Sequence, residues 1–248
     1  MEILTLITPT GDRPLAFALC QNWIRKQTLR PDQWIVIDDG KIPIKPTVPM
    51  QYVRREPLPD DPKHTLILNL EEAMPLIKNS KIMIMEDDEY YAPGYIAEMA
   101  IRLNQYEVVG IGKSKYYHLP SGGYFRIKNM THASLAQTAF RSSFLPEFKE
   151  LLKKSNVGLD SKIWIKANKN GRGFIFVDSD KNPLYLGIKG LPGRAGIGNG
   201  HDPTLYRRYP HDTTREILKR LIPKDYGIYM DIITGKLTEE NYQSWLKK

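Results

Sequence analysis

Four consecutive acidic residues, Glu-Asp-Asp-Glu at positions 86–89, follow directly on a short apolar run at positions 81–85. The run has the length and composition of a buried strand, so the acids are expected at its carboxyl end. Carboxylates crowded together repel one another, and a cation among them relieves that repulsion. Hard divalent ions such as Mg²⁺ and Mn²⁺ prefer carboxylate oxygen. The pattern therefore indicates a metal site, with a solvated acidic turn as the alternative.

Polar residues also end the first two predicted strands. The strand at 2–8 runs into Thr-Pro-Thr at 8–10, and the strand at 33–37 runs into Asp-Asp-Gly at 38–40. Helical patterns separate the strands, which predicts an α/β protein with a mostly parallel central sheet flanked by helices. The carboxyl ends of parallel strands meet at one edge, so the three polar clusters are expected to line one crevice. Neither G-x-G-x-x-G nor a P-loop sequence follows the first strand, which argues against both of those nucleotide-binding folds.

The second half of the chain predicts smaller elements. Residues 116–140 have the pattern of hairpin material with a Ser-Gly-Gly turn at 121–123. Five glycines lie in the loop at 190–200. We expect a main domain over residues 1–205, with halves at 1–115 and 116–205, and a basic, helical C-terminal extension over 206–248.

Composition places the chain of 248 residues among ordinary globular proteins, with 41% hydrophobic and 26% charged residues. The single cysteine, Cys20, excludes an internal disulfide. No apolar stretch approaches the roughly 20 residues that span a bilayer. The N-terminus lacks the basic leader and cleavage site of a signal peptide. We therefore expect a cytoplasmic protein without a transmembrane segment.

Basic residues are in excess, with 36 Lys and Arg against 28 Asp and Glu, and the excess is uneven. Positions 181–224 hold nine basic and three acidic residues, and positions 113–128 hold four basic residues and no acid. Such asymmetry favours a polyanionic partner or a phosphorylated substrate, with a solvated basic face as the alternative.

Three segments, in this order, resemble the opening of a family-two-type glycosyltransferase with the GT-A fold: T-P-T-x-x-R-P at 8–14, V-I-D-D-G at 36–40 and E-D-D-E at 86–89. The resemblance is good over roughly the first 115 residues and continues more loosely to about residue 200. It implies a GT-A-like sheet with a small hairpin. It also implies transfer of a sugar from a nucleotide-diphosphate donor, UDP-glucose or a similar compound, to a hydroxyl group. The first half of the main domain would bind the nucleotide sugar and the second half the acceptor.

The resemblance also assigns roles to single residues. In that family the first strand end and the aspartates after the second strand hold the nucleotide. Acids of the D-x-D type hold a divalent metal, Mn²⁺ or Mg²⁺, on the donor diphosphate. Glu86 stands where aspartate is more usual, so Asp87 can share its role. The residues implied for donor binding are Thr8, Pro9, Thr10, Arg13, Asp38, Asp39, Asp87 and Arg194, and those implied for the metal are Glu86, Asp88 and His201.

Two later segments complete the predicted site. Residues 157–164 resemble the family's later acidic segment, in which an aspartate at a helix start takes the acceptor proton, so Asp160 is the candidate catalytic base. The alternative is that Asp160 only caps the following helix. In the glycine-rich loop, backbone N–H groups can approach phosphate and Arg194 supplies a fork of donors. The resemblance implies that a histidine following such a loop completes the metal sphere, which here would be His201. A merely flexible loop is the alternative.

The acceptor is predicted from aromatic and basic residues interleaved at 113–128. Such residues can stack on a base displaced from a duplex and neutralise its phosphates. Ordinary bases lack a hydroxyl acceptor, so the leading hypothesis is hydroxymethylpyrimidine in bacteriophage DNA, modified in the host cytoplasm. The alternatives are a cell-surface polysaccharide or lipid-linked glycan as acceptor and, outside enzymes, a basic nucleic-acid-binding module. The predicted acceptor-binding residues are Lys113, Lys115, Tyr116, Tyr117, Arg126 and Lys128.

Overall fold

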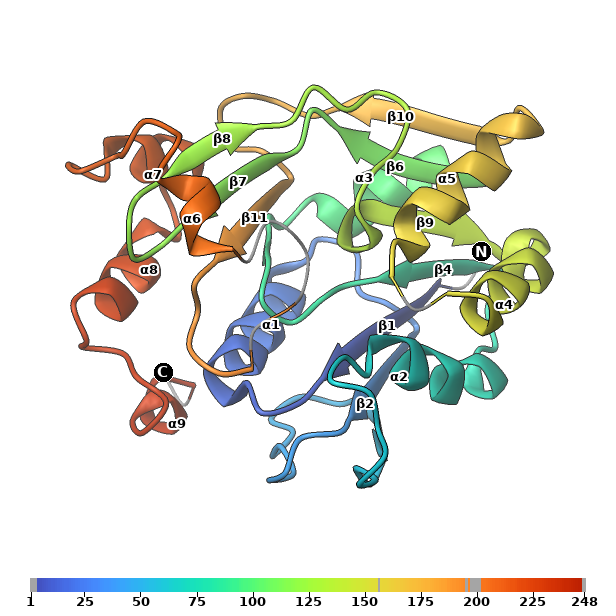
Figure 1. Ribbon diagram of the computed structural model, residues 1–248, viewed down its shortest axis with the longest axis horizontal. Coiled ribbons are helices and arrows are strands. Elements are labelled where there is room, and N and C mark those ends of the chain that lie inside the picture. The colour runs from blue at the N-terminus through green and yellow to red at the C-terminus, as the bar shows by residue number, and fades with distance from the viewer. Residues whose placement is uncertain (1–3, 156, 195, 197–201, 247–248) are drawn as a thin grey trace.

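The computed structural model describes residues 4–155, 157–194, 196 and 202–246. Within them, two sheets form the centre of the molecule (Figure 1). The large sheet has the order β10-β6-β9-β4-β1-β2-β3, and the small sheet has the order β5-β11-β7-β8. The large sheet contains β1 (Leu4–Thr10), β2 (Gln33–Asp38), β3 (Gln51–Arg54), β4 (Lys81–Ile84), β6 (Val108–Gly112), β9 (Thr138–Arg141) and β10 (Gly173–Val177). The small sheet contains β5 (Tyr90–Tyr91), β7 (Lys115–His118), β8 (Tyr124–Arg126) and β11 (Tyr185–Lys189).

The large sheet is parallel around its first strand. β1 pairs in parallel with β2 on one side and with β4 on the other, and β2 pairs in parallel with β3. Parallel neighbours need crossover connections, which are usually helical. Helix α1 (Pro14–Lys26) connects β1 to β2, and helix α2 (Leu66–Ala73) lies between β3 and β4. The predicted mostly parallel α/β architecture is confirmed.

One strand of the large sheet runs against its neighbours. β9 is antiparallel to both β4 and β6, whereas β6 and β10 are parallel. The sequence placed residues 116–140 together as hairpin material, but only β7 and β8 form the hairpin. A short apolar run does not indicate which sheet it joins. The position of β9 is fixed by packing, because Ala139 faces one side of the sheet and Phe140 the other.

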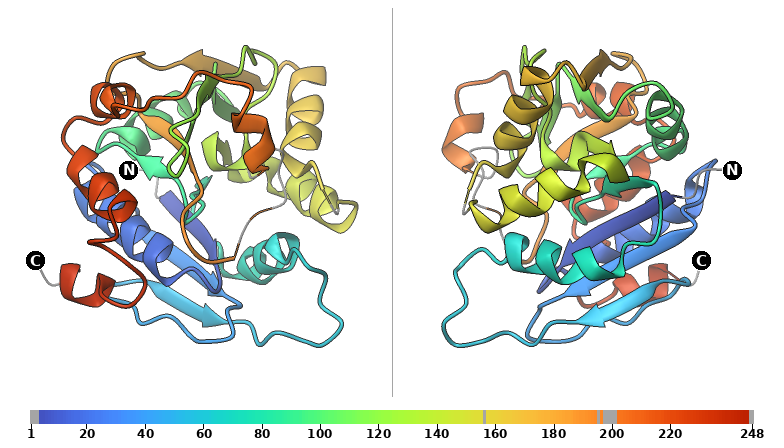
Figure 2. Two further views of the ribbon diagram at one scale, coloured as in Figure 1. Left: turned by 60° about the vertical axis from the view of Figure 1, so that its left-hand side comes forward. Right: turned by 90° about the vertical axis from the view of Figure 1, so that its right-hand side faces the viewer.

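Helices cover both faces of the large sheet, because each central strand is apolar on both sides. Leu6 and Val36 face the core formed with α1 and α3 (Tyr95–Arg102). Ile7 and Ile35 face the core formed with α2, α4 (Leu145–Lys153) and α5 (Leu159–Lys169). Figure 2 shows α4 and α5 side by side on the second face. The further helices are α3 (Tyr95–Arg102), α4 (Leu145–Lys153), α5 (Leu159–Lys169), α6 (Pro203–Tyr206), α7 (Glu216–Leu221), α8 (Tyr226–Ile233) and α9 (Tyr242–Trp245), with 3-10 turns at Met74–Leu76, Leu135–Gln137 and Ser142–Phe144.

The C-terminal helices pack onto the core beside α1. Tyr229 of α8 stacks on Trp23 with ring centroids 6.1 Å apart, and Lys26 forms an ion pair with the buried Asp225 at 2.5 Å. The expected boundary at residue 205 falls inside α6. The described residues 206–246 include α7, α8 and α9, and apolar residues of these helices pack on the same core as the sheet. In the part of the chain that the structure describes, no helix is long and apolar enough to cross a membrane.

Candidate active site

The four acids at positions 86–89, called here the acidic run, lie beside the end of β1 at the carboxyl edge of the large sheet. The run follows β4, and its second acid, Asp87, is fully buried. The hydroxyl of Thr10 donates a hydrogen bond to Asp87 at 2.6 Å. The guanidinium of Arg13 lies 3.3 Å from Asp87 and 2.6 Å from Asp88. The structure therefore brings the polar ends of β1 and β4 together, as the sequence predicted.

Three carboxylates of the acidic run lie close enough to share a cation. Glu86, Asp88 and Glu89 each offer one oxygen, and these three oxygens lie within 4.8 Å of one another. Burial, and then repulsion by Asp88, raises the pKa of Glu86. Burial also raises the pKa of Asp87 and Glu89, although basic neighbours oppose the rise. Clustered hard oxygen donors with excess negative charge fit a divalent cation.

Glu89 and Lys189 form a buried ion pair that sequence analysis missed. The Lys189 ammonium lies 2.5 Å from one oxygen of Glu89, and the backbone N–H of Ile188 donates to the other at 2.6 Å. The pair joins the acidic run to β11 of the small sheet. Glu89 was visible as the fourth acid of the run, but nothing local to residue 189 marks it as the partner of an acid 100 positions earlier.

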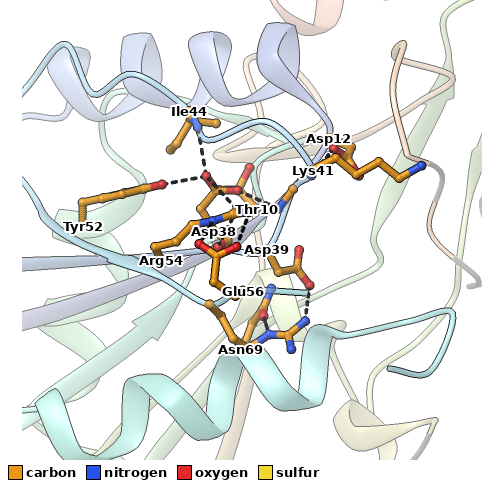
Figure 3. A network of polar contacts seen from close by, with 12 residues as sticks. Thr10, Asp12, Asp38, Asp39, Lys41, Ile44, Tyr52, Arg54, Glu56 and Asn69 are labelled. Atoms are coloured by element: carbon orange, nitrogen blue, oxygen red, sulfur yellow. Dashed lines mark hydrogen bonds and ion pairs between the residues drawn. The ribbon is translucent and has the colours of Figure 1, made fainter. Parts of the chain in front are cut away.

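Asp39, at the end of β2, is held by two arginines. Arg55 donates to one oxygen at 2.9 Å and Arg194 to the other at 2.5 Å; Figure 3 shows Asp39 within the network at this strand end. Burial alone would raise the pKa of Asp39, but hydrogen bonds from Arg194, Thr65 and Arg55 hold it below its usual value. The close approach also explains Gly11, because a Cβ there would lie 2.2 Å from the Asp39 carboxylate.

Two of the residues predicted to bind the donor serve the surrounding structure. Asp38 accepts hydrogen bonds from the backbone N–H of Ile44 and the hydroxyl of Tyr52, both at 2.9 Å (Figure 3). Thr8 accepts a hydrogen bond from the indole of Trp34 at 3.0 Å. Both are fully buried. They lie behind the site and shape the ends of β1 and β2.

A cavity of about 680 Å³ opens at this edge of the sheet. It collects residues from elements far apart in the sequence, including the small sheet and α5. Thr8, Asp38, Asp39 and Asp87 do not line it, and His201 lies outside the described residues. The residues predicted for the site that do line it are Pro9, Thr10, Arg13, Glu86, Asp88, Tyr116, Asp160 and Arg194.

Asp160 lies in the first turn of α5 on the cavity wall. The helix begins at Leu159, and the N-cap position is taken by Gly158, whose φ of +67° is in the left-handed region. One carboxylate oxygen of Asp160 accepts the backbone N–H of Ser161 at 2.9 Å. Asp160 is therefore not the N-cap, and its side chain is only half-buried beside the cavity.

Two of the residues predicted to bind the acceptor are buried away from any ligand. Lys115 is 1% exposed and forms an ion pair with Asp178. Tyr117 is fully buried, and its hydroxyl donates to Asp212 at 3.0 Å. Alternation along β7 turns both side chains toward the interior, so neither lines the cavity.

The other predicted acceptor residues remain on the outside or at the cavity. Lys113 and Lys128 are exposed. Arg126 forms an ion pair with Asp180 at 2.8 Å, which reduces its free charge. Tyr116 lines the cavity. Its ring stacks on the ring of Phe125, another cavity residue, with centroids 5.2 Å apart, so an aromatic wall faces the site.

His64 lines the cavity, although no local sequence pattern marks it as a site residue. It lies between β3 and α2, and its Nε2 is buried without a hydrogen-bond partner among the described residues. Burial, and then the charges of Lys63 and Arg194, lowers its pKa. A neutral imidazole with a free ring nitrogen can hydrogen-bond to a ligand in the cavity.

Comparison with known proteins establishes the fold. No family model matches the chain, and no curated protein matches its sequence. S. aureus TarS 1–349 in complex with UDP-GlcNAc is similar with a TM-score of 0.55 and 13% identity, over 98% of this chain and 78% of that chain. A longer TarS structure has a TM-score of 0.53 at 12% identity over 98% of this chain, which spans about half, 47%, of its length. The mannosyltransferase PcManGT from Pyrobaculum calidifontis, in complex with GDP-Man and Mn²⁺, has a TM-score of 0.52 and 14% identity, over 83% of this chain and 61% of that chain.

The low pKa of Asp39 predicts a pH-dependent contribution to stability. Because the pKa is lower in the folded protein than in the unfolded chain, this contribution is present above about pH 4 and is lost as pH falls through the folded pKa. We expect Asp39→Asn to reduce the free energy of unfolding by about 1–3 kcal/mol at neutral pH, and the difference from wild type to shrink below about pH 4. Urea unfolding over this pH range measures the difference in the free energy of unfolding. The control is Asp180→Asn, because the carboxylate of Asp180 is 63% exposed. A difference that does not vary with pH would contradict the assignment.

Proposed function

We propose that the protein is a metal-dependent glycosyltransferase that moves a sugar from a nucleotide-diphosphate donor to a hydroxyl acceptor. One observation carries the proposal: a single cavity is lined by a carboxylate cluster, by two arginines from separate segments and by a further carboxylate on α5. The two arginines, Arg13 and Arg194, suit a diphosphate, which is a polyanion. Asp160 suits proton transfer. A basic nucleic-acid-binding module would not require buried acidic residues in a cavity.

The donor is proposed to be a UDP-sugar. The fold shared with TarS, whose structure holds UDP-GlcNAc, supports this choice. The fold shared with PcManGT, whose structure holds GDP-Man, leaves a GDP-sugar as the alternative. The diphosphate is expected between the acidic run and the two arginines, Arg13 and Arg194. His64 and the carboxyl end of β2 would then lie near the nucleoside.

A divalent metal fits the residues of the cavity. Glu86 and Asp88 would hold it, with Glu89 as a further carboxylate ligand, because one oxygen of each lies within 4.8 Å of the others. The shared fold with PcManGT, whose structure contains Mn²⁺, supports a divalent ion here. When bound, such an ion stabilises the negative charge that develops on a departing diphosphate.

The side chains of this chain supply the remaining chemistry. The carboxylate of Asp160 accepts the proton of the acceptor hydroxyl while the hydroxyl oxygen forms a bond to the anomeric carbon of the sugar. The bond from that carbon to the diphosphate oxygen breaks, and its electron pair leaves with the diphosphate. Arg13 and Arg194 hold the diphosphate, and the apolar wall around Leu159 and Phe125 limits access of water to the cavity.

The acceptor proposed on this structure is a glycan, of a polysaccharide or a lipid-linked chain. Tyr116 and Phe125 form an aromatic wall that can pack against a sugar ring. The basic surface expected for DNA is smaller than the sequence predicted, because Lys115 is buried and Arg126 is paired with Asp180. DNA containing hydroxymethylpyrimidine stays the second candidate, supported by the exposed lysines at 113 and 128.

Asp88→Asn tests the metal and donor site. We expect UDP to raise the melting temperature of the wild-type protein only when Mn²⁺ is present, and this stabilisation to disappear in Asp88→Asn, because the variant loses a charged ligand. Thermal unfolding with UDP, with and without Mn²⁺, measures it. Asp180→Asn, which removes a carboxylate of the same type far from the acidic run in sequence, should behave as wild type. Equal UDP–Mn²⁺ stabilisation of Asp88→Asn and wild type would show that the site is assigned wrongly.

Asp160→Asn tests the catalytic base. The variant keeps the size and the helix position of the side chain, so donor binding should match wild type. We expect the rate of sugar transfer to fall by about 10²–10⁴-fold, the usual effect of removing a general base. Transfer to an acceptor panel, measured beside UDP binding to the same preparation, separates the two effects. Near-normal transfer by Asp160→Asn would mean that another group takes the proton.

Duplex binding distinguishes the two acceptor classes. If DNA is the acceptor, the protein should bind hydroxymethyl-containing duplex at low salt, with affinity that falls steeply as salt rises because counterions are released. Radiolabelled sugar should then appear on that duplex and not on unmodified DNA. If a glycan is the acceptor, we expect sugar transfer to the glycan and no binding of the protein to DNA at low salt. Electrophoretic mobility shifts and label transfer measure the two outcomes.

A further inference from the structure

The guanidinium of Arg13 lies beside the acidic run, where a bound metal cation is also expected. Arg13 lies at the junction of β1 and α1, and its side chain is only 18% exposed. Its guanidinium is 2.6 Å from one oxygen of Asp88 and 3.3 Å from Asp87. Asp88 is also one of the three carboxylates whose oxygens cluster within 4.8 Å. The same acid therefore serves both the arginine and the proposed metal.

A guanidinium and a divalent ion that share one carboxylate oppose each other. Both carry positive charge within a few ångströms of Asp88, and like charges at that separation repel strongly where water is largely excluded. The repulsion is relieved if a new anion accepts the arginine. The diphosphate of the donor is such an anion, and Arg13 already lines the cavity in which it would bind.

We propose that Arg13 is the resident counter-ion of Asp87 and Asp88, held by them without metal and transferred to the donor diphosphate when metal and nucleotide bind together. This inference rests on the proposed function and adds a coupling to it. Arg13 weakens the binding of metal alone and strengthens the binding of metal with nucleotide. The two ligands therefore enter as a pair, because each raises the affinity for the other.

Arg194 provides the matched comparison within the same cavity. It also carries a guanidinium and lines the cavity, but it pairs with Asp39 at the end of β2 and not with the acidic run. Asp39 keeps a second arginine, Arg55, at 2.9 Å. Removal of Arg194 should therefore weaken nucleotide binding without changing the affinity for metal alone.

The test is a titration of Mn²⁺, followed by electron paramagnetic resonance of the free ion, with and without UDP. For Arg13→Gln we expect Mn²⁺ alone to bind about tenfold or more tightly than to wild type, since one opposing charge is removed. UDP, which should strengthen Mn²⁺ binding to wild type, should strengthen it much less in this variant. Arg194→Gln should bind Mn²⁺ alone as wild type does and bind UDP–Mn²⁺ more weakly.

Stability provides a second readout. Arg13→Gln leaves Asp87 and Asp88 without their arginine, so its melting temperature should fall, and Mn²⁺ should raise it by more than it raises that of wild type. If Arg13→Gln does not fold, Arg13→Met replaces it, because methionine keeps an apolar stem in this buried position and also removes the opposing charge.

Three outcomes overturn the inference. Equal or weaker Mn²⁺ affinity in Arg13→Gln, or in Arg13→Met where that variant stands in, shows that the arginine does not oppose the metal. Tighter Mn²⁺ binding in Arg194→Gln shows that the effect is a general one of charge in the cavity. These first two outcomes leave the proposed function intact as long as UDP–Mn²⁺ binds to wild type. Absence of Mn²⁺ binding to wild type and every variant overturns the inference together with the metal site.

Discussion

Burial of three carboxylates, Asp87, Asp88 and Glu89, beside a fourth at one sheet edge is the constraint on which the rest of this structure depends. Removing one partner of a buried ion pair typically costs about 3–5 kcal/mol, so these three buried acids need partners from other elements. Thr10 and Arg13 come from the end of β1, which is adjacent to β4 in the sheet. Lys189 comes from β11, which places the small sheet over the acids. The arrangement of both sheets is thus coupled to the charge balance of the site.

The residues around the cavity form two groups with different tasks. One group faces the cavity, including Arg194 and Asp160. The other lies behind it and positions the first, as Asp39 does when it holds Arg194, and as Asp38 does when it fixes the chain after β2. Their residue types alone do not separate the groups, because a buried aspartate that orients an arginine and one that contacts a ligand have the same sequence signature. The separation depends on the direction of each side chain in the fold.

The sequence predicted the parts of the structure that are encoded locally. The acidic strand end, the β1 and β2 ends and the helix that presents Asp160 were all found where periodic or terminal patterns marked them. Partners that meet only in three dimensions were missed, such as Lys189 with Glu89. Lys115 and Tyr117 were assigned to the surface from charge and aromatic content, but alternation along β7 places both inside. His64 had no local pattern and became a candidate only through the cavity that surrounds it.

The C-terminal helices support the acidic run from a distance. Tyr90 follows the last acid directly, and its hydroxyl donates to Asp225 at 3.0 Å while its ring packs edge-on against Trp23 at 5.0 Å and against Tyr229 at 6.4 Å. None of these three partners lines the cavity. A chain that ended before Asp225 would therefore lose the hydrogen bond that holds Tyr90 at the end of the acidic run. The geometry of the carboxylates would loosen although every residue of the cavity wall was still present.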